Sequence, residues 1–227
     1  MDPARYVLKG GASLRYFFAS ERYSEDIDLD LIRPVPWNLE RQVDAALTSP
    51  ALRSLLAIGG LSLAEFTSAK QTETTRRWKV GIEAPRDSVL IRSKIEFSNR
   101  EGGGDYSLAS LPQAVVEPYA LRPPSVQHYD AATAVQQKVA ALAGRAQVQA
   151  RDVFDLELLL RQQPLSKGSI DATLLDAAVG RALEQDYAAF RDQVLPFLEP
   201  GAAELIASES AWEQIQTFVA DRLEAAR

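Results

Sequence analysis

The stretch that decides the fold is LKGGASLRYFFASERYSEDIDLDL, which runs from Leu8 to Leu31. It ends in DIDLD, a run of alternating carboxylates from Asp26 to Asp30. Successive side chains of a β-strand point to opposite faces, so a strand here would place all three aspartates on one face. Like charges at that spacing repel, and a fold tolerates them most readily where a cation neutralises them. Oxygen ligands suit Mg²⁺ or Mn²⁺, so the run predicts a metal site; a solvated acidic edge strand is the alternative.

The composition of the 227-residue chain excludes several kinds of site. With 46% hydrophobic and 25% charged residues, the sequence is typical of a globular protein of one substantial domain or two small ones. The absence of cysteine excludes disulfides and thiolate chemistry, and a single histidine, His128, excludes a multi-histidine metal site. No apolar run reaches transmembrane length, so we expect a cytoplasmic protein with no membrane partner. A net charge of −6 argues against a broadly basic surface that binds nucleic acid, although a local basic groove is compatible with it.

A glycine turn precedes the carboxylate run. The sequence predicts a short buried strand over residues 6–8, the turn Lys9-Gly10-Gly11, and a helix over residues 13–19. Glycine lets the backbone turn sharply and approach a ligand, and the amides at a helix N-terminus can hold a phosphate. The turn is therefore a candidate phosphate site, with a plain tight turn as the alternative.

Further helices and strands are predicted before residue 122. Apolar spacing predicts two helical pieces over residues 37–58, with a break at Ser49-Pro50, and then strands over residues 61–67, 77–83 and 89–98. In the last strand, Lys94 and Glu96 lie on the face opposite Ile95 and Phe97. Glu96 would complete a cage of three carboxylates if this strand lies beside the aspartate strand; otherwise it is an exposed residue or a partner of Lys94.

The character of the sequence changes at a proline-rich joint, residues 122–125. Everything before the joint mixes strands and helices, and nearly everything after it is helical in pattern. We therefore predict an α/β domain over residues 1–122 and a helical domain over residues 123–227.

The helical part carries a second group of charges. A helix over residues 130–143 carries Lys138, and one over residues 147–162 carries Asp152 and Asp155. If one helix continued through Gly144, Lys138 and Asp152 would share a face; a break at Gly144 would instead give a helical hairpin. A solvated charged stripe is the other interpretation. Three more amphipathic helices are predicted over residues 171–227, with a core that includes Leu205, Phe190 and Trp212.

The motifs LKGGASL, RYSEDIDLDL, IRSKIEFS and a helical K…R…RDVFDL occur in an order that resembles the AbiEii/AbiGii-type nucleotidyltransferases. These are toxins of bacterial toxin–antitoxin and phage-defence operons within the DNA polymerase β-like superfamily, and the resemblance covers about the first 160 residues. It implies an α+β fold: a polymerase β-like domain with a mixed sheet flanked by helices, then a helical bundle that completes the active site. Family members usually carry helices before the first strand, so either the start of this sequence is internal or the member is shortened.

The resemblance also implies roles for individual residues. Asp26 and Asp28 would bind the metals, with Glu96 as a third ligand and as the base toward the acceptor hydroxyl. Lys138 and Asp152 would complete the catalytic set, and Asp30, which lies outside the minimal motif, would at most support it. The implied nucleotide-binding residues are Lys9, Gly10, Gly11, Ser13, Arg22, Ser24 and Lys138.

The implied reaction is the Mg²⁺- or Mn²⁺-dependent transfer of a nucleoside monophosphate from an NTP to a hydroxyl acceptor. By resemblance the acceptor is the 3′ end of tRNA, with a protein hydroxyl next, and a cognate antitoxin is the expected partner. A basic region on the central strands could line a groove for RNA, with a solvated charged surface as the alternative; it comprises Arg76, Arg77, Lys79, Arg92 and Lys94.

The sequence leaves two rival functions open. One is a small-molecule nucleotidyltransferase of the aminoglycoside-modifying kind, against which the RDVFDL helix argues. The other is a catalytically inactive module that binds an antitoxin, against which the intact Asp26, Asp28 and glycine turn argue.

Overall fold

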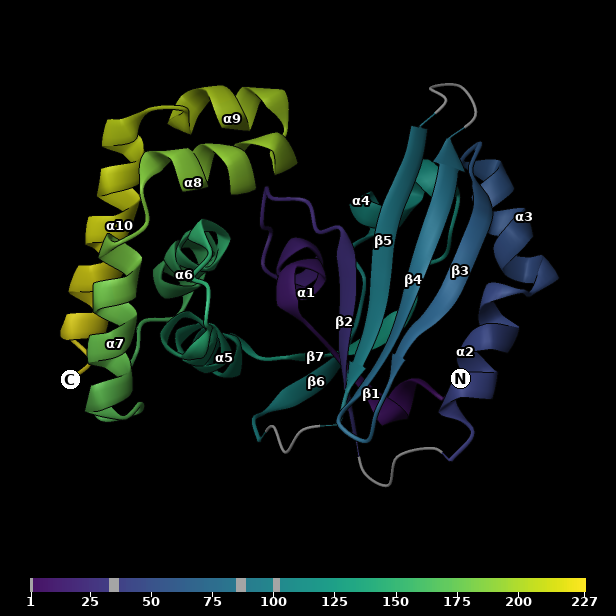
Figure 1. Cartoon of the computed structure of the whole chain (residues 1–227), viewed down its shortest axis with the longest axis horizontal. Helices are drawn as coiled ribbons and strands as arrows, with labels where there is room; N and C mark the ends of the chain where they lie inside the picture. Colours follow the sequence, from purple (N-terminus) through teal and green to yellow (C-terminus); the bar gives the residue numbers. More distant parts are fainter. Residues whose placement is uncertain (1, 33–36, 85–88, 100–102) are drawn as a thin grey trace. The chain divides into compact units, whose positions relative to one another are not determined.

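The computed structural model describes residues 2–32, 37–84, 89–99 and 103–227, which form two compact units (Figure 1). Unit 1 contains the chain up to Phe17 and then Ser24–Tyr129, and unit 2 contains Phe18–Tyr23 and Asp130–Arg227. The boundary thus falls later than the predicted division into 1–122 and 123–227, and a short early segment joins the helical unit.

Unit 1 is built on a mixed sheet whose strands, within the described ranges, lie in the order β3-β4-β5-β2-β1-β7-β6. The pairs β1–β7 and β2–β5 are parallel and the other neighbouring pairs are antiparallel. The strands are β1 (Tyr6–Lys9), β2 (Asp26–Leu31), β3 (Ser62–Gln71), β4 (Thr75–Ala84), β5 (Val89–Ser98), β6 (Tyr106–Ser110) and β7 (Ser125–Tyr129). The predicted strands are therefore confirmed, whereas β6 and β7 were missed. The pairing of β7 with β1 explains why unit 1 extends beyond the proline-rich joint.

The helices described in unit 1 are η1 (Pro3–Arg5), α1 (Gly10–Phe17), α2 (Leu39–Leu47), α3 (Pro50–Ile58), α4 (Gln113–Val116) and η2 (Glu117–Tyr119). Of these, α1, α2 and α3 were predicted, whereas η1, α4 and η2 were not. The predicted break between α2 and α3 is confirmed: the Ser49 hydroxyl accepts a hydrogen bond from the Leu52 amide at 3.1 Å, and Pro50 occupies the first turn of α3. Proline fits there because the missing N–H is not needed in the first turn.

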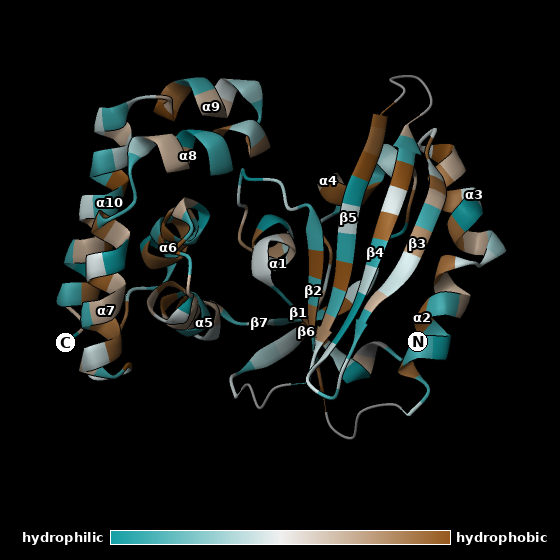
Figure 2. Cartoon of the chain, in the orientation of Figure 1, coloured by the Kyte–Doolittle hydropathy of each residue, from teal (hydrophilic) through white to brown (hydrophobic). Residues whose placement is uncertain are grey.

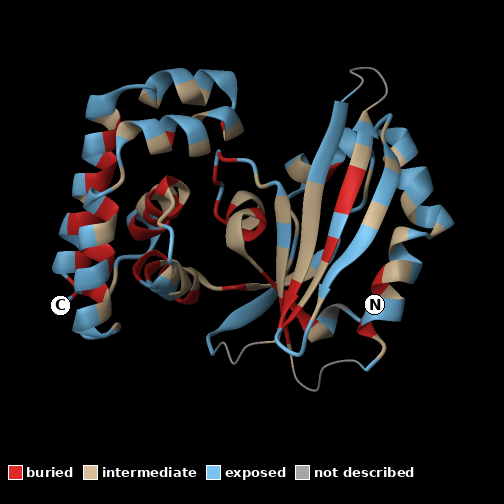
Figure 3. Ribbon diagram, in the orientation of Figure 1, coloured by how far each residue is buried: buried red, intermediate tan, exposed pale blue. Residues whose placement is uncertain are grey.

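One face of the sheet in unit 1 is apolar and buried. Trp78 of β4 and Phe97 of β5 pack with Tyr6 and with Leu39 and Val43 of α2. Figure 3 shows the buried positions along β4, and Figure 2 shows apolar and polar residues alternating along β4 and β5. Since side chains alternate along a strand, this core turns the polar residues of the same strands to the other face.

Unit 2 consists of helices in its described part: α5 (Ala131–Gly144), α6 (Ala150–Gln162), α7 (Ala172–Leu183), α8 (Tyr187–Gln193), η3 (Leu195–Phe197), α9 (Pro200–Ile206) and α10 (Glu209–Glu224). Asp130 caps α5 by accepting a hydrogen bond from the Thr133 amide at 2.8 Å. The helix ends at Gly144, so the continuous helix through this residue is wrong and the alternative of two packed helices is right.

The C-terminal part of unit 2 differs from the prediction in two respects. Residues 171–227 form four α-helices instead of three, because Asp186 caps a separate α8 by accepting from the Ala189 amide at 2.7 Å. The core prediction is right for Phe190 and Trp212, whose rings stack with centroids 4.6 Å apart, and wrong for Leu205, which is 84% exposed.

Candidate active site

Parallel pairing of β2 with β5 places the predicted carboxylates side by side. Asp28 lies opposite Glu96 in the register, and Asp26 lies opposite Lys94. The condition on which Glu96 was included, that its strand lies beside the aspartate strand, is thus met. These residues lie on the polar face, since Ile95 and Phe97 between them face the core.

Two of the three carboxylates are paired with cations. The Lys94 ammonium lies 2.7 Å from Asp26 Oδ2, and the Arg77 guanidinium donates to Glu96 Oε2 at 2.6 Å. Among the residues that the structure describes, no three histidine, cysteine or acidic side chains form a metal-binding group. Carboxylates and cations therefore alternate along this face.

Asp28 differs from its two neighbours because, among the described residues, it makes no hydrogen bond or ion pair. Burial raises the pKa of its carboxyl, and Glu96 and Asp26 raise it further, while Lys94 and Lys9 act in the opposite direction. Burial and the neighbouring carboxylates thus outweigh the two lysines, and a bound divalent cation would complete the charge compensation of an ionised Asp28.

The glycine turn lies directly against Asp28. Gly10 has a φ of +68°, and a Cβ atom at this position would lie 2.8 Å from Asp28 Oδ2. A side chain would therefore be strained by the backbone conformation and would also collide with the carboxylate. Because Gly10 begins α1, with Gly11 and Ser13 in the same helix, the N-terminal amides of α1 and the Asp28 carboxylate are neighbours.

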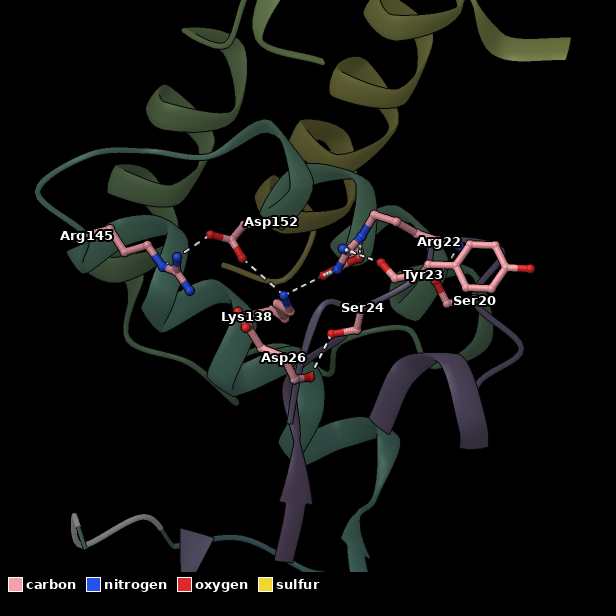
Figure 4. A network of polar contacts seen from close by, with 9 residues as sticks. Ser20, Arg22, Tyr23, Ser24, Asp26, Lys138, Arg145 and Asp152 are labelled. Carbon is pink, nitrogen blue, oxygen red and sulfur yellow. Dashed lines mark hydrogen bonds and ion pairs between the residues drawn. The ribbon is translucent and has the colours of Figure 1, made fainter. Parts of the chain in front are cut away.

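Asp30 and Lys9 form a supporting pair beside this turn. The Lys9 ammonium donates to Asp30 Oδ1, and the Tyr129 hydroxyl donates to Asp30 Oδ2 at 2.9 Å. Asp30 is buried and neutralised within the protein, and Tyr129 is a partner that no sequence pattern indicated. Ser24, predicted to bind nucleotide, donates from its hydroxyl to the Asp26 carbonyl at 3.0 Å and so orients the start of β2 (Figure 4).

Unit 2 contains the second predicted group of charges (Figure 4). The Lys138 ammonium of α5 donates to Asp152 Oδ1 at 3.1 Å and to Asp155 Oδ2 at 2.5 Å, both on α6. The Arg22 guanidinium donates to both oxygens of Asp155 at 3.0 Å, and Arg145 Nε lies 3.3 Å from Asp152 Oδ2. Lys138 and Asp152 do meet, although across two packed helices instead of along one.

Asp155 is the buried residue of this group that the predicted site set omits, and the more exposed Arg145 is omitted as well. The signal for Asp155 in the sequence was its place one helical turn beyond Asp152 in RDVFDL, which puts both carboxylates on one face of α6. Burial alone would raise the pKa of Asp155, but the charges and hydrogen bonds of Lys138 and Arg22 outweigh it and hold the pKa below its usual range. Burial likewise disfavours the charged form of Lys138, yet Asp155 and Asp152 hold its pKa above its usual range. Lys138 and Asp155 are therefore both charged at neutral pH.

The two halves of the predicted site belong to different units. Asp26, Asp28 and Glu96 lie in unit 1, and Lys138 and Asp152 lie in unit 2. That the two halves act on one substrate stays a prediction.

A hollow of about 490 Å³ opens on the polar face of β3, β4 and β5 within unit 1. Four of the five predicted basic residues line it, namely Arg77, Lys79, Arg92 and Lys94. The fifth, Arg76, forms an ion pair with Glu40 at 3.7 Å. The same hollow is also lined by Asp26 and two glutamates, so the candidate metal residues and the basic groove adjoin.

A mixed sheet that carries carboxylates on neighbouring strands, beside a glycine turn that opens a helix, has the architecture of a nucleotidyltransferase. The model of the family described as nucleotidyl transferase AbiEii toxin, Type IV TA system, matches residues 2–224. The chain belongs to this family, which is one of toxins whose systems include an antitoxin and whose substrates include an NTP.

Solved structures are similar in fold. JHP933 from Helicobacter pylori matches with a TM-score of 0.57 and 17% sequence identity, over 97% of this chain and 86% of that protein. A candidate nucleotidyltransferase from H. pylori matches with a TM-score of 0.59 and 17% identity, over 98% of this chain and 89% of that protein. A comparison with curated proteins finds no significant match. In the described part of the chain, no helix has the length and apolar character needed to cross a membrane.

Proposed function

We propose that this toxin transfers a nucleoside monophosphate from an NTP to a hydroxyl acceptor in a reaction that depends on Mg²⁺ or Mn²⁺. The observation that carries the proposal is the position of Asp28. Its half-buried carboxylate makes no hydrogen bond or ion pair among the described residues, lies opposite Glu96 and two residues from Asp26, and lies against the glycine turn. A metal ligand beside a phosphate-binding turn has these properties.

The donor chemistry of the residues present fits a hard divalent cation, although Asp26 and Glu96 would have to turn from Lys94 and Arg77 to gather around it with Asp28. Asp26, Asp28 and Glu96 would hold it, and these ligands are oxygen donors on adjacent strands. When bound, the metal would polarise the α-phosphate and neutralise charge on the leaving pyrophosphate. Lys94 and Arg77, which now compensate two of the carboxylates, would be left to contact phosphate oxygens.

The chain's own groups would bind the nucleotide and handle the proton. The α1 amides at Gly10 and Gly11 would bind the triphosphate, with Lys9 and Ser13 beside them. Lys138 has three N–H donors and uses two on Asp152 and Asp155, which leaves one for a phosphate oxygen. Glu96 would take the proton from the acceptor hydroxyl as it attacks.

For the acceptor we propose the 3′ end of tRNA, with a protein hydroxyl as the second candidate. The hollow lined by Arg77, Lys79, Arg92 and Lys94 supports RNA, because an array of cations beside Asp26 would bind a phosphodiester backbone. Transfer onto tRNA would block aminoacylation, and growth arrest of an infected cell would give phage defence. Both substrates are found in the cytoplasm, where we expect the toxin to act.

The test is incubation of the purified chain with each α-³²P-labelled ribonucleoside triphosphate, Mg²⁺ and, in parallel, total tRNA, a protein extract or aminoglycosides. We expect label on tRNA, none after EDTA treatment and none with Asp28→Asn. The matched control is Asp44→Asn, which removes a carboxylate that accepts from Trp78 Nε1 at 2.8 Å on the core side of the sheet.

Three outcomes would contradict parts of the proposal. Label on aminoglycosides alone would favour the small-molecule enzyme, and label on protein alone would replace the acceptor. Growth inhibition that persists with Asp28→Asn would favour the inactive, antitoxin-binding module.

A further inference from the structure

Asp155 lies at the centre of the charge cluster in unit 2. Its side chain is fully buried, and each of its oxygens accepts from the Arg22 guanidinium at 3.0 Å. Oδ2 also accepts from Lys138 at 2.5 Å. One buried carboxylate thus fixes two cations from segments that lie far apart in the sequence.

Arg22 is largely committed to this arrangement. Three of its five N–H donors are used, two on Asp155 and one on the Tyr23 carbonyl at 3.1 Å. Arg22 lies in the segment Phe18–Tyr23, which belongs to unit 2. The main chain of this segment forms hydrogen bonds with other residues of that unit. The Gln162 side chain donates to the Phe18 carbonyl at 2.9 Å, and the Tyr23 amide donates to the Phe197 carbonyl at 2.7 Å.

Of the two cations that contact Asp155, Lys138 is the more accessible. Its side chain keeps 13% of its surface exposed, whereas that of Arg22 keeps 6%. Around it lie the negative charges of Asp152 and Asp155 and the positive charges of Arg22 and Arg145, so the cluster as a whole carries one surplus positive charge. A surplus charge and an unused N–H at the same ammonium suit a phosphate oxygen.

We infer that Asp155 is a positioning residue, which fixes the Lys138 ammonium so that its unused N–H can contact a phosphate oxygen of the nucleotide, while Arg22 fixes Asp155. The inference rests on the proposed function for the identity of the ligand. Arg22, which was predicted to contact the nucleotide directly, would instead act through Asp155. Asp155 itself is a residue that the family resemblance left outside the predicted site.

The test compares steady-state kinetics of variants of the full chain with each of the four ribonucleoside triphosphates and Mg²⁺. Asp155→Asn alone leaves Arg22 buried without a counter-charge, so the informative variant is the double change Asp155→Asn with Arg22→Met, which removes both charges. We expect its KM for the NTP to rise about 10- to 100-fold with kcat within a few-fold of wild type, because Lys138 loses one of its two orienting hydrogen bonds. Asp155→Glu should restore part of the affinity.

Leu159→Ala is the matched control, since Leu159 is a fully buried residue one turn further along α6. It should lower the free energy of unfolding without changing KM. If the double variant and Leu159→Ala have equal KM values, the positioning role is overturned.

A second readout separates this inference from the proposed function. Acetic anhydride reacts with neutral amines. The charge and the hydrogen bond of Asp155 both raise the pKa of Lys138, and the charge of Arg22 lowers it by a smaller effect, so removal of both residues should lower that pKa. Mass spectrometry should therefore find Lys138 acetylated several-fold faster in the double variant. If the wild-type chain turns over no NTP, the proposed function is refuted. If Lys138 is acetylated at the same rate in the double variant and in wild type, the inference about Asp155 is refuted on its own.

Discussion

The contact between Gly10 and Asp28 yields a prediction that separates stability from catalysis. The perturbation is Gly10→Ala, which places a methyl group 2.8 Å from Asp28 Oδ2 at a residue with a φ of +68°. The chain offers a matched control in Gly60, which has a φ of +69° and open space, with no other atom within 4 Å, where a Cβ atom would lie. Gly60→Ala therefore introduces the same backbone strain without the collision.

The two substitutions should cost similar stability. A left-handed conformation at alanine costs roughly 1–2 kcal/mol, and the lower entropy of the unfolded chain returns about 0.4–1 kcal/mol. Each variant should thus lose on the order of 1 kcal/mol. The collision at Gly10 adds little to this loss, because the atom that must move is the free end of the Asp28 side chain. It should change activity instead. If Asp28 binds the metal as proposed, a carboxylate displaced by a few tenths of an ångström would hold it poorly, and we expect a loss of about 10- to 100-fold in kcat/KM.

Urea unfolding and NTP transfer, measured on both variants and wild type, test this reasoning. Equal unfolding free energies for the two variants, with activity lost only in Gly10→Ala, are the expected result. Equal activities would refute the argument that Gly10 shapes the position of Asp28. A much larger loss of stability in Gly10→Ala would show that the carboxylate is held rigidly in place.

Three further predictions concern single side chains. Asp28→Asn should raise the free energy of unfolding at pH 7 and stop transfer. Burial raises the pKa of Asp28 above its usual value of 3.8, so folding makes ionisation of this carboxyl costly. That cost is absent below pH 3.8 and grows as the pH rises through the raised pKa, and the asparagine variant avoids it. Urea titrations at about pH 4 and pH 7 measure this, and an equal effect at both would contradict it. Tyr129→Phe removes a hydrogen bond to Asp30 and should cost about 1.5–3 kcal/mol in urea unfolding; no measurable loss would make that bond dispensable. Lys79→Glu should weaken tRNA binding about 10-fold at low salt and less at high salt in a filter-binding titration, and a salt-independent effect would exclude a phosphate contact at that site.

Short-range patterns predicted the elements of the fold that carry their own local signals. The alternation of DIDLDL specified β2 and its polar face, Ser49-Pro50 specified the start of α3, and Asp130 specified the start of α5. Strands β6 and β7 escaped prediction because they are short, lie on either side of a proline-rich joint and lack a strong apolar alternation. Their place in the sheet is decided by pairing of β7 with β1, more than a hundred residues earlier in the sequence.

Contacts between distant segments account for what the sequence could not reveal about the candidate site. Arg22 and Asp155 are 133 residues apart in the sequence. Their ion pair forms within unit 2, because the segment Phe18–Tyr23 packs with the helices of that unit. Neither residue alone has a local pattern that requires the other. Glu96 was identified only conditionally for the same reason, because its use depends on β5 lying beside β2.

Electrostatics divide the candidate residues into two kinds. In unit 2, Asp155 and Lys138 compensate each other, and the pKa of each is moved in the direction that favours its charged form. In unit 1 the pKa of Asp28 is moved in the opposite direction, so folding disfavours the charge that metal binding needs. Asp30, two residues further along the same strand, is neutralised internally by Lys9 and Tyr129. The chain thus compensates Asp30 fully, whereas at Asp28, beside the glycine turn, Lys94 and Lys9 do not outweigh burial and the neighbouring carboxylates. The metal ligand that we propose Asp28 to be would have this property, because its remaining counter-charge would come with the bound cation.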